Sequence, residues 1–82
     1  MDKIDNIELK KIIAEALDVD ESLVTNATEE GSIEEWDSLG QLSILTLLDS
    51  KIDGDISGIS ELGKANSVML IQEILTKKGF MK

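Results

Sequence analysis

The 82-residue chain contains no cysteine, histidine, tyrosine, arginine or proline, and it has one tryptophan and one phenylalanine. Without cysteine, neither disulfide bonds nor thiolate-bound zinc can stabilise the fold, and nothing indicates an oxidising compartment. Without histidine, a serine nucleophile has no imidazole base, so the usual catalytic triad cannot be assembled. The acidic pairs at 29–30 and 34–35 lie in a strongly negative stretch, where we expect solvated carboxylates rather than a general acid and base. We therefore expect no enzyme.

Long apolar runs are also absent. No run approaches the roughly 20 residues that span a bilayer, and no basic segment followed by an apolar stretch opens the sequence. No repeat or low-complexity segment divides the chain, so residues 1–82 are expected to form one domain. A chain this short buries only about 60% of its unfolded surface, so its core must be small. We expect a monomeric, cytoplasmic protein that does not enter membranes.

Positive charge is scarce and unevenly placed. The chain has 17 acidic residues against 8 lysines, a net charge of -9. Between Glu15 and Glu61 there are thirteen acids and one lysine, Lys51, and the other seven lysines lie towards the two ends. Nucleic acid, whose phosphates require cationic side chains, is effectively excluded as a partner. The expected partners are proteins with basic surfaces.

Apolar residues recur at helical spacing in three segments, and no segment keeps the strict alternation of a half-buried strand. The first pattern ends near Asp18, the second covers 39–52 before Asp53, and the third follows Asn66, a candidate N-cap. A short helical turn is expected around Ser60–Lys64. The three apolar stripes are Leu9, Ile12, Ile13, Ala16 and Leu17; Ile44, Leu45, Leu47, Leu48 and Ile52; and Val68, Ile71, Ile74 and Leu75.

The connection 20–37 is long for a compact domain, which rarely carries about 15 residues of loop unless they have a role. Four apolar residues are expected to fix this loop to the helices: Leu23, Val24, Ile33 and Trp36. The chain is thus predicted to be an all-α protein, a small three- to four-helix bundle with a long loop between the first and second helices.

Residues 49–60, DSKIDGDISGIS, imitate a calcium-binding loop, with aspartate at the first and fifth positions and glycine at the sixth. The third position is Lys51, and the twelfth is Ser60, where a bidentate glutamate is required. We therefore expect a helix end and a turn here, and no metal site.

The start of the second helix, WDSLGQLSI at 36–44, has two interpretations. Asp37 or Ser38 can cap the helix by accepting hydrogen bonds from its first N–H groups. At 100° per residue, however, Leu39 falls on the outer face in one row with Ser43, Thr46 and Ser50, and Leu42 lies at its border. Leu39 either folds back onto the loop or contacts a partner.

These residues resemble the acyl carrier proteins. The Asp37-Ser38-Leu39 triplet opens a second helix after an acidic loop, in an anionic helical domain of this length without cysteine. The similarity covers nearly the whole chain: LKKIIAEALDVDESLVTNAT looks like the first helix and the loop start, and ANSVMLIQEIL looks like the last helix.

The resemblance implies that Ser38 carries a phosphopantetheine arm, attached from coenzyme A by a separate phosphopantetheinyl transferase. An acyl or aminoacyl group would be bound as a thioester on that arm, partly sheltered between the second helix and the segment 56–62. Acyl-loading and acyl-using enzymes with basic docking surfaces would then recognise the acidic surface, with Asp37, Leu39, Leu42 and Asp49 as the partner-binding residues.

The chain departs from the housekeeping fatty-acid carriers, which place acidic residues after the Ser-Leu pair and along the second helix. Here the corresponding residues are Gly40, Gln41, Ser43, Thr46 and Ser50. Together with Trp36, these departures indicate a specialised member that serves lipid or secondary-metabolite biosynthesis. From the residues alone, an unmodified acidic helical module that binds basic proteins stays open as the alternative.

Overall fold

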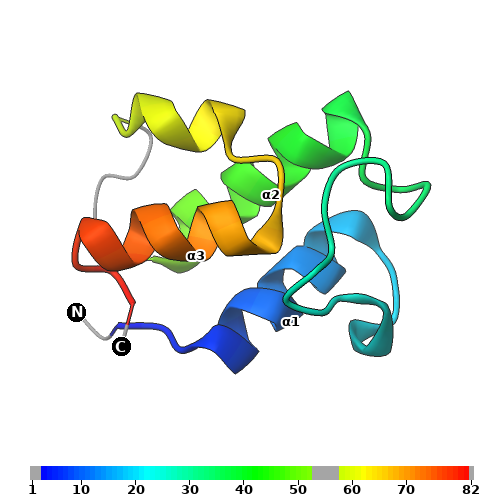
Figure 1. Ribbon diagram of the computed structural model, residues 1–82, viewed down its shortest axis with the longest axis horizontal. Coiled ribbons are helices and arrows are strands. Elements are labelled where there is room, and N and C mark those ends of the chain that lie inside the picture. Colours follow the sequence, from blue (N-terminus) through cyan, green and yellow to red (C-terminus); the bar gives the residue numbers. More distant parts are fainter. Residues whose placement is uncertain (1–2, 53–57, 82) are drawn as a thin grey trace.

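The computed structural model describes residues 3–52 and 58–81. In these ranges it contains three α-helices, α1 (Asn6–Leu17), α2 (Ser38–Lys51) and α3 (Val68–Lys77), and two 3₁₀ turns, η1 (Glu21–Leu23) and η2 (Ser60–Lys64). The predicted all-α bundle is confirmed, including the loop between the first two helices and the short turn at Ser60–Lys64 (Figure 1). The described helices include none that is both long and apolar enough to cross a membrane.

The first helix ends next to Asp18, as its sequence predicts. Asp5 caps it by accepting a hydrogen bond of 2.8 Å from the Glu8 N–H. At the other end Asp18 adopts the left-handed conformation (φ 57°) and donates its N–H to carbonyls of the last turn. The buried face of α1 consists of Leu9, Ile12, Ile13, Ala14 and Leu17, with Ala16 half-buried at its edge.

The third helix begins one residue later than predicted. Its N-cap is Ser67, whose Oγ accepts from the Leu70 N–H at 3.1 Å. Asn66, the predicted cap, instead offers its backbone carbonyl to the Glu30 N–H at 2.8 Å. The prediction of Asn66 was therefore wrong, because pairing of its backbone with the loop holds it one step outside the helix. Asp53, predicted to follow the second helix, lies outside the described residues.

One hydrophobic core joins the three helices. The fully buried side chains come from every helix and from the loop: Leu9, Ile13, Trp36, Ile44, Leu48, Val68, Ile71 and Leu75. The predicted stripes of the three helices supply seven of these eight, and Trp36 of the loop completes the set. Burial of apolar area at about 25 cal/mol per Å² is the main stabilising term for such a core.

The long loop is fixed to the bundle at several points. Trp36 is 1% exposed and Val24 is buried, as predicted, while Ile33 is half-buried. Leu23 is exposed, so its predicted role was wrong: it lies in the one-turn helix η1, and the next residue takes the inward position. The Thr28 carbonyl also accepts a hydrogen bond from the Val68 N–H at 2.9 Å, which joins the loop to the start of α3.

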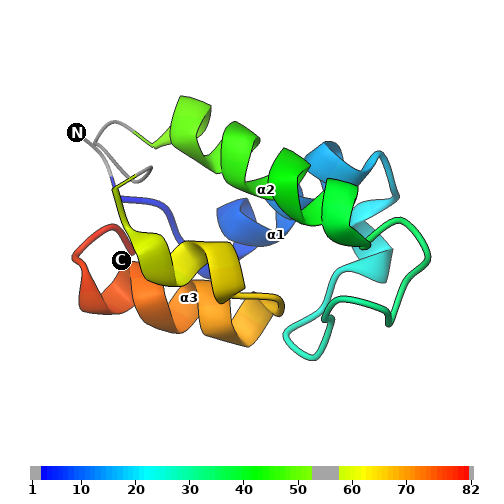
Figure 2. The same ribbon diagram turned by 90° about the horizontal axis from the view of Figure 1, so that it is seen from above.

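The loop and the chain ends lie at opposite ends of the molecule. The starts of α2 and α3 adjoin the loop at one end, and both termini emerge at the other (Figure 1 and Figure 2). Ile4 and Met81 are both buried and form an isolated parallel bridge, supported by a hydrogen bond of 3.2 Å from the Ile4 N–H to the Phe80 carbonyl.

Candidate functional site

The start of α2 is capped by Asp37, so Ser38 is not needed for capping. The Asp37 carboxylate accepts a hydrogen bond of 2.9 Å from the Gly40 N–H. Ser38 is the first residue of the helix and is exposed, and within residues 3–52 and 58–81 its hydroxyl has no hydrogen-bond partner. The capping interpretation therefore holds for Asp37 and leaves the Ser38 hydroxyl accessible at a helix N-terminus.

On the inner side of α2, Gly40 packs closely against the loop and the end of α1. A Cβ atom on Gly40 would clash with the Glu35 carbonyl oxygen and would lie 2.8 Å from Leu17 Cδ2. Only glycine lets the loop backbone and the end of α1 approach the helix this closely. Gly40, where the housekeeping carriers have an acidic residue, is buried in this structure.

Gln41 is likewise buried rather than on the surface, at 8% exposed. Its Oε1 accepts a hydrogen bond of 2.8 Å from Trp36 Nε1, and its Nε2 donates to the carbonyls of Ala65 at 2.9 Å and Leu62 at 3.4 Å. Sequence reasoning missed this residue. The signal was present, because at 100° per residue Gln41 falls beside the buried Leu48, on the apolar side of the helix.

The outer side of α2 is open. Leu39 is 74% exposed and Leu42 is 61% exposed. Leu39 therefore does not fold back onto the loop, and the two leucines form an apolar surface next to Ser38. Exposed leucines that adjoin a free hydroxyl are suited to contact with another protein.

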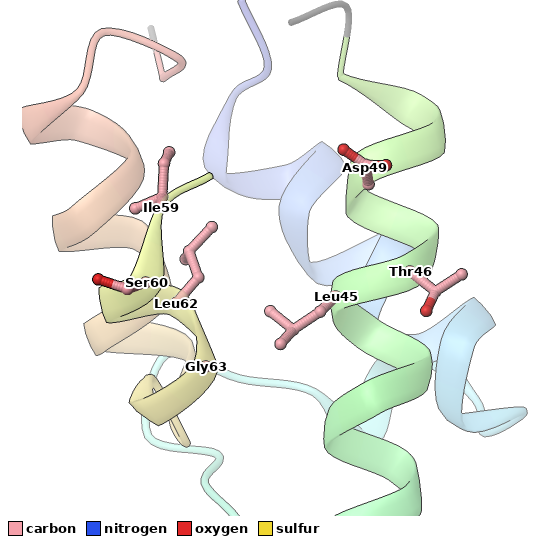
Figure 3. A pocket seen from close by; sticks show the side chains of 7 residues that line it. All are labelled: Leu45, Thr46, Asp49, Ile59, Ser60, Leu62 and Gly63. Atoms are coloured by element: carbon pink, nitrogen blue, oxygen red, sulfur yellow. The ribbon is translucent and has the colours of Figure 1, made fainter. Parts of the chain in front are cut away.

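A pocket of about 360 Å³ lies between α2 and η2. Its lining residues are Leu45, Thr46, Asp49, Ile59, Ser60, Leu62 and Gly63. Leu45 and Leu62 point towards one another across it, whereas Thr46 points to the other side of α2 (Figure 3). Of the segment 56–62 that the family resemblance indicated, Ile59, Ser60 and Leu62 line this pocket, and Ile56 lies outside the described residues.

A second hollow lies on the other flank of α2, against α1. This open groove is lined by Glu15, Ala16, Leu39, Leu42, Ser43, Thr46, Leu47 and Ser50. Ser38, Leu42, Leu45 and Asp49 follow one another at spacings of four, three and four, so they form one row along α2. Leu45 and Asp49 of this row line the pocket, whereas Leu42 lines the groove. Leu39 and Ser43, on the neighbouring row, also line the groove.

The acidic residues of the loop surround the start of α2. Glu34, Glu35 and Asp37 are exposed, and so are the paired carboxylates Glu29 and Glu30, as expected for solvated groups. Earlier in the loop, hydrogen bonds from Ser22 lower the pKa of the exposed Asp20 below its ordinary value. This end of the molecule therefore carries a strong negative field at neutral pH.

Asp49 lies apart from this acidic loop. It is exposed and lines the pocket nearly three turns beyond Ser38, about 16 Å along the helix axis at 1.5 Å per residue. The structure thus brings Asp37, Leu39 and Leu42 together around Ser38, whereas Asp49 is placed near the far end of the same row. In the described ranges, no three acidic side chains gather as a metal site would require.

Comparisons of this chain with models of known protein families, with curated proteins and with solved structures give no match.

Proposed function

We propose that the protein is a carrier that bears a phosphopantetheine arm on Ser38 and passes an acyl group, bound to that arm, between partner enzymes. The observation that supports this most directly is Ser38, an exposed residue at the N-terminus of a helix that another residue already caps, whose hydroxyl has no hydrogen-bond partner among the described residues. A helix N-terminus favours a nearby phosphodiester through its free N–H groups and its positive dipole end.

The attachment step needs only a nucleophile from this chain. Ser38 Oγ attacks the β-phosphorus of coenzyme A, the bond to the 3′-phosphoadenosine 5′-phosphate leaving group breaks, and the hydroxyl proton passes to a base of the transferase. The transferase also supplies the magnesium ion, so the absence of histidine from this chain is no obstacle. Once bound, the arm supplies the thiol that forms the thioester, which this cysteine-free chain cannot provide.

The surroundings of Ser38 fit such an arm. Leu45, on the Ser38 row, lies about 10 Å further along the helix axis and opens onto the pocket. A volume of about 360 Å³ is near the lower end of the roughly 300–1,000 Å³ of small-molecule sites, which favours short or medium acyl chains. Leu45 and Leu62 would contact the chain, while Asp49 would stay at the solvent edge.

Partner enzymes would contact the exposed leucines and the acidic loop near the start of α2. Leu39 and Leu42 offer an apolar contact, and the carboxylates of Asp37 and the loop attract basic side chains. The outer row of α2 is uncharged at Ser43, Thr46 and Ser50, so the partner's cations would face the loop rather than the helix. We propose that this selects enzymes of a specialised cytoplasmic pathway over those of general fatty-acid synthesis.

Intact mass tests the carrier function. The purified protein is incubated with coenzyme A, magnesium and a phosphopantetheinyl transferase, and one phosphopantetheine per chain is expected. The Ser38→Ala variant should gain nothing, and Ser43→Ala, which removes another exposed α2 hydroxyl, should be modified like the parent. If no transferase of the source organism modifies the chain, the acidic binding module becomes the better explanation.

A further inference from the structure

The side chain of Gln41 joins two parts of the molecule that share no other side-chain hydrogen bond in the described ranges. On one side it accepts from Trp36 Nε1 at 2.8 Å, two residues before Ser38. On the other it donates to the Ala65 carbonyl at 2.9 Å, at the end of η2. Because both the amide and the indole are buried, neither can exchange these partners for water.

The 3₁₀ turn η2 is also a wall of the pocket. Leu62, whose carbonyl accepts the longer 3.4 Å bond from Gln41, is a lining residue opposite Leu45. Besides the buried Leu62 side chain, η2 has one other polar side-chain contact in the described residues, the exposed ion pair of Glu61 with Lys78 at 3.6 Å, of a kind that contributes little. A chain too long for the volume of about 360 Å³ must press η2 away from α2, and it thereby pulls on the bonds to Gln41.

We propose that Gln41 couples occupancy of the pocket to the loop that precedes Ser38. When an apolar chain displaces η2, the bond to Ala65 lengthens, the amide shifts, and Trp36 loses its acceptor. The backbone amides of the loop at 32–37 then become less protected from hydrogen exchange. The coupling is reciprocal, so a partner that holds this loop in place also favours withdrawal of the chain from the pocket. This inference rests on the proposed function for its natural ligand, an acyl chain on Ser38, but its test does not.

The test uses the variant Ser38→Cys, because the chain has no other cysteine and Trp36 is its sole tryptophan. The new thiolate displaces iodide from N-dodecyl iodoacetamide or, as the short control, from N-methyl iodoacetamide. We expect the dodecyl adduct alone to shift the Trp36 emission to longer wavelength and to raise amide hydrogen exchange at 32–37 about fivefold. Equal emission and equal exchange in the two adducts would overturn the coupling.

Two controls assign the effect to Gln41. In Ser38→Cys with Gln41→Met, which keeps an unbranched side chain without the amide, the two adducts should no longer differ. Trp36→Phe removes the indole donor to Gln41, and because it also removes the fluorophore, only hydrogen exchange is measured. This variant should also abolish the difference in exchange between the two adducts. A dodecyl chain placed on Ser43→Cys, on the row that faces the groove, should leave the loop unchanged. If the dodecyl response persists in the Gln41→Met and Trp36→Phe variants, the chain acts through another route and Gln41 is not the link.

The result of the alkylation test can be separated from the result of the transferase test. The alkylated protein reports on coupling whether or not a transferase recognises Ser38, and the intact mass of the transferase reaction reports on modification alone. If no transferase modifies Ser38 but the dodecyl adduct still changes the loop, the protein would be a binding module whose pocket is coupled to the loop at 32–37.

Discussion

The inner and outer sides of the first two turns of α2 differ sharply. On the inner side, the Gly40 backbone touches the loop, and both ends of the Gln41 amide are hydrogen-bonded. On the outer side, Leu39 and Leu42 are mostly exposed, and the Ser38 hydroxyl makes no bond within the described ranges. The start of α2 is thus fixed by contacts on its inner side, while the side chains on its outer side are exposed. Substitutions on the inner side should therefore cost stability, and those on the outer side should affect only recognition.

The largest effect is expected from Trp36→Ala. Removing this buried indole leaves a cavity and an unpaired Gln41 Oε1, so the free energy of unfolding should fall by about 3–5 kcal/mol. Urea denaturation followed by circular dichroism measures the change. Leu23→Ala, a truncation at an exposed position of the same loop, is the matched control and should change it by less than about 0.5 kcal/mol. Equal losses in the two variants would mean that the loop is anchored as a whole rather than through Trp36.

Gly40→Ala should have the next largest effect. The added methyl group meets the Glu35 carbonyl and a Leu17 methyl group, and overpacking of this kind costs about 1–3 kcal/mol. Gly63→Ala adds the same methyl group where nothing lies within 4 Å, so its stability should match or slightly exceed that of the parent. Comparison of the two urea midpoints checks the prediction, which fails if Gly40→Ala is as stable as the parent.

Asp37 lies at the boundary between the two sides of α2. Asp37→Ala should therefore reduce both the stability of the protein and its modification by the transferase. Loss of the cap to the Gly40 N–H should lower the free energy of unfolding by about 1 kcal/mol. Asp37→Asn keeps the capping oxygen and removes the charge, so it should recover most of that stability. If both variants slow modification by the transferase, the charge of Asp37 contributes to recognition; if only Asp37→Ala does, the residue acts through the helix start.

Leu42→Ala should leave stability within about 0.5 kcal/mol of the parent, because the side chain lies on the outer side. Loss of an interface contact worth more than about 1 kcal/mol should nonetheless lower kcat/KM of the transferase about fivefold or more. Met69→Ala is the matched control, since Met69 on α3 is 62% exposed against 61% for Leu42. Steady-state rates that fall equally for both variants would contradict a docking role for α2.

The helices were predictable because local patterns determine them. The apolar stripes, the end of the first helix near Asp18 and the turn at Ser60–Lys64 all follow from spacing and from neighbouring residues. The helical wheel also placed Leu39 on the outer face with Leu42 at its border, whereas the question whether Leu39 folds back onto the loop was settled only by its exposure in the structure. What could not be predicted depends on distant backbone. The helical wheel places Gln41 on the apolar side, but its hydrogen-bond partners could not be predicted, because they are carbonyls 21 and 24 residues away. Ser67 displaces Asn66 as cap because Asn66 pairs with the loop.

The pairing of Ile4 with Met81 has a practical consequence. Both ends of the described chain emerge side by side, at the opposite end of the molecule from the start of α2 (Figure 1). An affinity tag, a fused enzyme or a biosensor surface joined at either end would hold the protein in one orientation and present the acidic loop outwards. Immobilisation through either end should therefore leave the rate of an added transferase unchanged.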